Sequence, residues 1–156
     1  MFKLLLVIVI AVIYTAFNYK SLGLTDTKEQ ATQAYEVTQN MRSGVAAAQD
    51  IQTAFESHIS NLQVNAKAQV VKVLPDDNEA PRHQRFILKL DNGITLLVAH
   101  NIDLAPRVES LNVGDTVEFN GEYEWNAKGG VVHWTHRDPQ GRHADGWLRH
   151  NGKIYQ

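Results

Sequence analysis

The sequence predicts a mainly β domain preceded by an N-terminal helical region. Residues 1–19 are almost wholly apolar, and residues 20–63 repeat apolar side chains at helical spacing. Residues 64–156 instead alternate apolar and polar side chains, as strands do. The chain of 156 residues therefore divides into a signal anchor or signal peptide, a helical stalk or packing helix, and a β domain.

The first segment indicates export. Lys3 precedes an uncharged apolar run from Leu4 to Phe17, and no A-x-A cleavage pattern follows this run. The segment reaches the lower limit of about 17 residues for a spanning helix. We expect an uncleaved signal anchor, giving a single-pass inner-membrane protein with a periplasmic domain. The alternative is a cleaved signal peptide, which would release the chain into the periplasm.

The second segment is expected to be helical. Asp26 and Glu29 are spaced like a capping box, and Ser43-Gly44 is a weak point. A coiled-coil-like stripe steps by four and three residues through Ala34, Thr38, Met41, Val45, Ala48, Gln52, Phe55, Ile59 and Leu62. The stripe packs either on the chain's own β domain or, through residues 26–63, on a second copy or another partner.

The third segment is predicted to begin with five strands. The runs are VNAKAQVVKVL, QRFILKL, GITLLVAH, TVEFNGEYEW and VVHWTH. DNG is a hairpin signal, and NIDLAPRVESLNV has room for one helical turn between the third and fourth strands. In the fourth strand, Val117, Phe119 and Tyr123 share one face, whereas Glu118, Glu122 and Glu124 share the other. This order predicts a small OB-like five-stranded barrel, with a generic small β-barrel or an SH3-like roll as the alternative.

The chain ends on HWTHRDPQGRHADGWLRHNGKIYQ, which holds four of its seven histidines. DPQG and DG are typical of turns. WLRH and KIY flank Asn151-Gly152, which predicts a terminal hairpin covering an open edge or end of the barrel. In such a hairpin Trp147 and Tyr155 are expected to be near neighbours.

Composition excludes some functions. The net charge is −2, and nucleic-acid binders normally carry a basic excess, so nucleic acid is not a favoured partner. The chain has no cysteine, which removes thiolate catalysis and cysteine-based zinc sites.

Arginine–histidine neighbours suggest a ligand-binding rim. Arginine forks bind phosphates and carboxylates, and histidine adds a donor or a proton shuttle. The candidate ligand-binding residues are His83, Arg85, His100, Arg107, His136, Arg142 and His143. A divalent metal is the candidate cofactor, with His83, His100, His136 and His143 as its donors. His133 and His136 lie three apart on a predicted strand and so face opposite sides.

The blocks VLPDDN, RHQRF, LLVAHNIDLAPR, GEYEWN, GGVVHWTH and GRHADGW resemble those of a bacterial family of short, secreted or membrane-anchored proteins of uncharacterised function. The resemblance covers about Val73 to Gln156 and leaves the helical segment outside. It implies export and a compact domain, and it offers no catalytic residues.

Three functions stay open. The first is a membrane-tethered extracytoplasmic domain that binds an anionic ligand or a partner through the Arg/His rim. The second is a metal-dependent phosphodiester hydrolase with a nuclease-like OB barrel. The third is an envelope structural or assembly protein. Whether the chain is an enzyme is undecided by its sequence.

Overall fold

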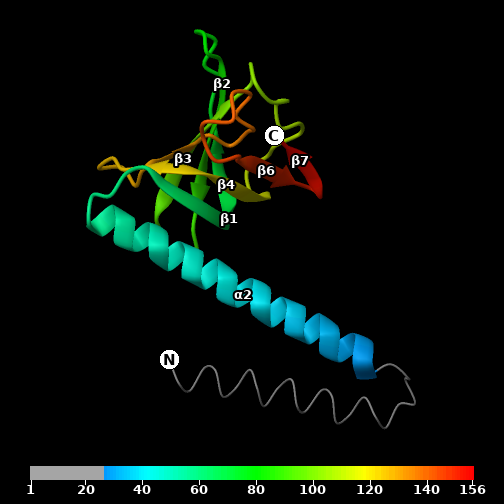
Figure 1. Cartoon of the computed structure of the whole chain (residues 1–156). Helices are drawn as coiled ribbons and strands as arrows, with labels where there is room; N and C mark the ends of the chain where they lie inside the picture. Colours follow the sequence, from blue (N-terminus) through cyan, green and yellow to red (C-terminus); the bar gives the residue numbers. More distant parts are fainter. Residues whose placement is uncertain (1–26) are drawn as a thin grey trace. The chain divides into compact units, whose positions relative to one another are not determined.

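The structure, a computed structural model, describes residues 27–156, so the expected signal anchor or signal peptide lies outside the described residues. The elements are helix α2 (Thr27–Glu56) and strands β1 (Leu62–Val73), β2 (His83–Lys89), β3 (Thr95–Asn101), β4 (Thr116–Glu124), β5 (Val131–His133), β6 (Trp147–His150) and β7 (Lys153–Tyr155) (Figure 1). No helix within residues 27–156 is long and apolar enough to cross a membrane.

Strands β1 to β5 close into a barrel. Their order is β1-β2-β3-β5-β4, and β4 pairs back with β1. β3 and β5 are parallel, whereas the other neighbouring pairs are antiparallel. The predicted OB-like five-stranded barrel is therefore confirmed. β1 begins at Leu62, slightly before the expected domain boundary at residue 64.

Strand alternation builds the core of the barrel. Along β4, Val117, Phe119 and Tyr123 are fully buried, while the glutamates between them face outward. Burying each such side chain contributes roughly 1.5–3 kcal/mol. Gly121 occupies the remaining inward position. A Cβ there would lie 2.5 Å from the carbonyl oxygen of His133, so β5 can approach β4 closely only at a glycine.

Helix α2 continues through Gly44 without a break. Its residues from Asn40 onward form one compact unit with the strands, and its first part, up to Gln39, groups apart from that unit. The buried positions are Ala48, Ile51 and Ala54, whereas Met41 and Val45 of the predicted stripe are 57% and 68% exposed. Ala48 of the predicted stripe is therefore buried together with Ile51 and Ala54, which lie outside the stripe, because contact with the barrel selects the buried face of this part of the helix.

The terminal hairpin is present and extends the sheet beyond the barrel. Asn151 and Gly152 have φ values of 49° and 77°, which suit the tight turn that Asn-Gly favours. β6 pairs with the part of β4 that β5 leaves free. Tyr155 is buried opposite Leu148, while Trp147 lies on the other face of β6. The expected contact between Trp147 and Tyr155 is therefore replaced by one between Leu148 and Tyr155.

Candidate functional site: a glutamate–histidine cluster beside β5

The arginines of the predicted rim are largely occupied by contacts within the chain. Arg85 donates to the carbonyl oxygen of Pro75 from Nε at 3.2 Å and from Nη2 at 3.1 Å. Arg107 forms a two-pronged ion pair with Asp76, with Nε 2.8 Å from Oδ2 and Nη2 3.2 Å from Oδ1. Both guanidinium groups hydrogen-bond to the β1–β2 loop, so fewer of their N–H donors are free for an external anion.

His100 is a core residue. It is fully buried, with Nδ1 2.8 Å from the hydroxyl of Thr135 and Nε2 3.1 Å from the carbonyl oxygen of Pro106. Burial lowers the pKa of His100 to about 4, against the Pro106 hydrogen bond, with smaller lowering effects from the charges of His136 and His83. Both nitrogens of His100 already have hydrogen-bond partners, so neither is free for a metal.

Of the remaining candidates, His83 begins β2, where its N–H donates to the carbonyl oxygen of Asp77 at 2.9 Å. His136, Arg142 and His143 come from the segment between β5 and β6, residues 134–146. Asp138 organises this segment, because its Oδ2 accepts hydrogen bonds from the N–H groups of Arg142 (2.6 Å) and His143 (2.9 Å). The Arg142 guanidinium contacts Gln140 within the same segment. His136 is 4% exposed, with Nδ1 2.8 Å from the neighbouring carbonyl oxygen of residue 137. Among the described residues, no hydrogen bond or ion pair links His143 to the neighbourhood of His100.

His143 instead packs over the outer face of the barrel. Its ring stacks on Trp134 with centroids 4.1 Å apart and an angle of 7° between the planes. Nε2 lies 2.6 Å from Oε2 of Glu122, and Nδ1 lies 2.8 Å from the carbonyl oxygen of Ala144. Burial opposes the charged ring, but these two hydrogen bonds raise the pKa of His143 above its ordinary value. With an acceptor at each nitrogen, the ring is suited to the imidazolium form.

The second oxygen of Glu122 points at His133, its partner across the β4–β5 ladder. Nε2 of His133 is 3.4 Å from Oε1 of Glu122 and 3.9 Å from Oε1 of Glu124. This nitrogen is buried and has no hydrogen-bond partner, because neither carboxylate has the geometry of a hydrogen bond to it. Donor atoms from the three side chains lie within 4.8 Å of one another. We name Glu122, Glu124, His133, Trp134 and His143 the Glu122 cluster.

The cluster differs from the rim expected from the sequence. Of the predicted donors it includes His143 alone, and it adds two glutamates and His133. The alternation along β4 predicts that Glu122 and Glu124 share the outer face, and this pattern is a signal by which the two glutamates could be found from the sequence. The register that sets Glu122 opposite His133 cannot be predicted from the sequence of either strand alone.

Residues 34–156 match a family described as "Protein of unknown function (DUF3465)". The chain belongs to this family. The DUF3465 match includes the barrel, the terminal hairpin and much of α2, so it extends further towards the N-terminus than the sequence blocks that begin near Val73. No curated protein matches the chain. The DUF3465 description assigns no activity, and the Glu122 cluster is therefore the principal evidence about function.

Imidazole and carboxylate donors of this kind suit zinc and other divalent transition metals. His133, Glu122 and Glu124 supply three donors, and His143 holds Glu122 in place. A carboxylate that is itself hydrogen-bonded by a neighbour is typical of metal sites, where the outer partner fixes the orientation of the ligand. The cluster can therefore act as a metal centre with three protein ligands.

Proposed function

We propose that this DUF3465 domain is a membrane-tethered extracytoplasmic binding module that holds a divalent transition-metal ion at the Glu122 cluster. The observation that carries the proposal is the 3.4 Å separation between Oε1 of Glu122 and the unbonded Nε2 of His133. Ligand atoms of a tetrahedral zinc ion, each about 2.0–2.1 Å from the metal, lie about 3.3–3.4 Å apart. The two atoms are spaced as two ligands of one ion are.

Three protein ligands leave a fourth position of a tetrahedral ion for water or another ligand. An anionic ligand of the domain is accordingly proposed to bind at the metal. The arginines are less suited to this role, because Arg85 and Arg107 already bond to the β1–β2 loop. Zinc bound to two carboxylates and a neutral imidazole has no net charge, so an anion at the open position meets no electrostatic penalty from the site itself.

Calorimetric titration of the full-length chain in detergent with Zn²⁺ at pH 7.5 tests the proposal. One ion is expected to bind per chain. His133→Ala and Glu124→Gln are each expected to weaken binding at least tenfold, because each removes a ligand. Glu118→Gln is the matched control. Glu118 also faces outward on β4, but it pairs with Arg149 at 3.0 Å and lies outside the cluster.

The affinity is also expected to fall as the pH is lowered, because protons compete with the metal for its imidazole and carboxylate ligands. If the wild-type chain takes up no zinc, or if His133→Ala binds it as tightly as the wild type does, the proposal is wrong. Equal losses in Glu118→Gln and Glu124→Gln would likewise point to diffuse attraction by surface carboxylates and contradict a defined site.

A further inference from the structure

The first half of β1 has an edge that no other described strand covers. β4 pairs with β1 from Leu62 to Gln69 on one side. β2 pairs with β1 only from Gln69 onward. The edge opposite β4 is therefore open from Leu62 until β2 begins to pair. Open edges are places where another extended chain can add as a strand.

Backbone groups of alternate residues face this open edge. The N–H of Val70 donates to the carbonyl oxygen of Asp115, 2.8 Å away on the β4 side. In an antiparallel pair, residues that exchange hydrogen bonds alternate with residues that do not. Gln63, Asn65 and Lys67 therefore direct their N–H and C=O groups away from β4. Among the described residues, no backbone group is paired with them on that side.

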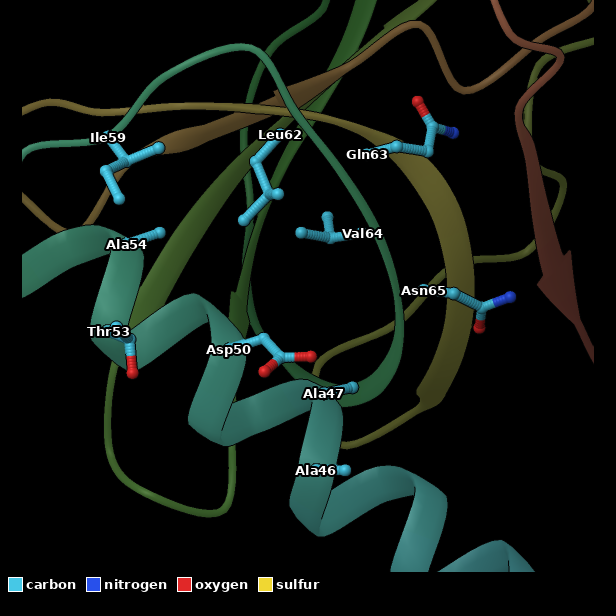
Figure 2. Close-up of a pocket in the computed structure, with 10 residues that line it drawn as sticks. All are labelled: Ala46, Ala47, Asp50, Thr53, Ala54, Ile59, Leu62, Gln63, Val64 and Asn65. Atoms are coloured by element: carbon cyan, nitrogen blue, oxygen red, sulfur yellow. The ribbon is translucent and has the colours of Figure 1, made fainter.

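Helix α2 lies beside the open edge and leaves a groove of about 490 Å³ (Figure 2). Ala46, Ala47 and Asp50 line it from the helix, and Leu62 and Val64 line it from the strand. This volume falls within the range of about 300–1,000 Å³ that is usual for binding pockets. Because the helix side carries alanines where larger side chains would fill the space, the groove stays open along the strand.

The groove combines an apolar lining with the carboxylate of Asp50. Ala46, Ala47 and Ile59 give it an apolar lining, and Ile59 is 45% exposed. Asp50 is exposed at the groove and forms no ion pair with another described residue. Small apolar side chains therefore fit the lining, and a lysine or arginine beside them complements Asp50.

We propose that this groove binds an extended segment of a partner polypeptide, which adds to β1 as a strand and presents apolar and basic side chains to α2. The backbone groups of Gln63, Asn65 and Lys67 provide hydrogen bonds that do not depend on sequence. Every second side chain of the bound segment then lies in the groove, which selects among side chains, as in other sites where a peptide adds to a sheet edge. The intervening side chains face solvent.

Amide hydrogen exchange of the full-length chain in detergent tests whether the edge is open. The amides of Gln63, Asn65 and Lys67 are expected to exchange quickly, and those of Val64 and Ala66, which face β4, to exchange slowly. Slow exchange at all five amides in the dilute protein would overturn the proposal. Protection of the first three that grows with protein concentration would also overturn it, because the occupant would then be a second copy of this chain.

Selection from a randomised heptapeptide library, with the full-length chain as bait, tests the occupant. Enriched peptides are expected to alternate apolar residues and to carry a lysine or arginine among them. Their binding should fall at least tenfold in Asp50→Lys and in Ala46→Trp, which fills the groove from an exposed helix position. It should be unchanged in Glu79→Lys, a charge reversal in the β1–β2 loop, with melting temperatures confirming that every variant folds.

N-methylation of the enriched peptides, at the amides that face β1, should abolish their binding. The methyl groups remove the backbone N–H donors of the bound peptide. The proposal is overturned if no peptide is enriched, or if the enriched peptides bind Ala46→Trp as well as the wild type. It is also overturned if methylated peptides retain their affinity, since side chains alone would then account for binding.

Discussion

At the scale of single residues, three histidines show how surroundings give one side chain different chemistry. His100 has both nitrogens hydrogen-bonded in the core. His143 pairs with Glu122. The buried Nε2 of His133 has no hydrogen-bond partner. A nitrogen that already holds a hydrogen bond is a poor metal ligand, so His133 is the donor to consider. The sequence identified histidines but could not tell these environments apart, because they depend on residues distant in the chain.

His100 is expected to make folding stability depend on pH. Its pKa is about 4 in the folded chain, against an ordinary value of 6.5. The unfolded chain thus binds more protons between these values, so stability is fully present above pH 6.5 and is lost as pH falls towards 4. The loss attributable to this group is about 3 kcal/mol.

Urea unfolding at pH 4.5 and pH 7 measures that loss. The difference in unfolding free energy between the two pH values should shrink in His100→Gln. It should stay as in the wild type in His58→Gln, because His58 is exposed. An unchanged difference in His100→Gln would show that His100 is not the group responsible.

At the scale of elements, the segment between β5 and β6 completes the site. Trp134, the first residue after β5, has a φ of 50°. At the other end of the segment, Gly146 donates its N–H to the carbonyl oxygen of His136 at 2.9 Å. The alternation of β4 predicted which glutamates face outward. The fold of the segment was not predictable, because it depends on left-handed backbone at Trp134 and Gly141 and on the close backbone approach at Gly146, which hydrophobic patterns do not record.

Gly146→Ala is expected to displace this segment. The added Cβ would lie 1.9 Å from the carbonyl oxygen of Trp134 and 2.6 Å from that of Asn120. We expect a loss of about 1–3 kcal/mol in unfolding free energy and weaker zinc binding, since the stack of His143 on Trp134 is disturbed. Urea unfolding and zinc titration measure the two effects.

Gly44→Ala is the matched comparison, and the opposite sign is expected. Among the described residues its Cβ would meet Cε of Lys67 alone, at 3.8 Å. Alanine is favoured over glycine inside a helix by about 0.5–1 kcal/mol. Equal effects of the two substitutions on stability would contradict the close approach at Gly146.

At the scale of the whole molecule, the sequence predicted the barrel because five alternating runs and their turn signals lie in the order that closes it. It did not predict which face of α2 is buried. Ile51 and Ala54 are covered by the barrel, whereas Met41 and Val45 are not. Tertiary contact decides that choice, and the helix alone offers several apolar faces. The groove along β1 was unpredictable for the same reason.

The tether is a prediction for the whole chain that rests on residues 1–19. Intact mass spectrometry of protein extracted from the membrane fraction is expected to find Met1 still attached, because no A-x-A cleavage pattern follows the apolar run. A shorter chain cut near residue 17 and free in the periplasm would replace the anchor with a signal peptide. Metal binding at the Glu122 cluster does not depend on that outcome.

The most direct test of the metal centre is an anomalous-difference map from crystals of the chain grown with zinc, measured on both sides of the zinc absorption edge. One strong peak is expected, coordinated by Nε2 of His133 and the Oε1 atoms of Glu122 and Glu124. The metal should lie about 2.0–2.2 Å from each of these atoms. The absence of a peak there, or a peak held by other histidines, would contradict it.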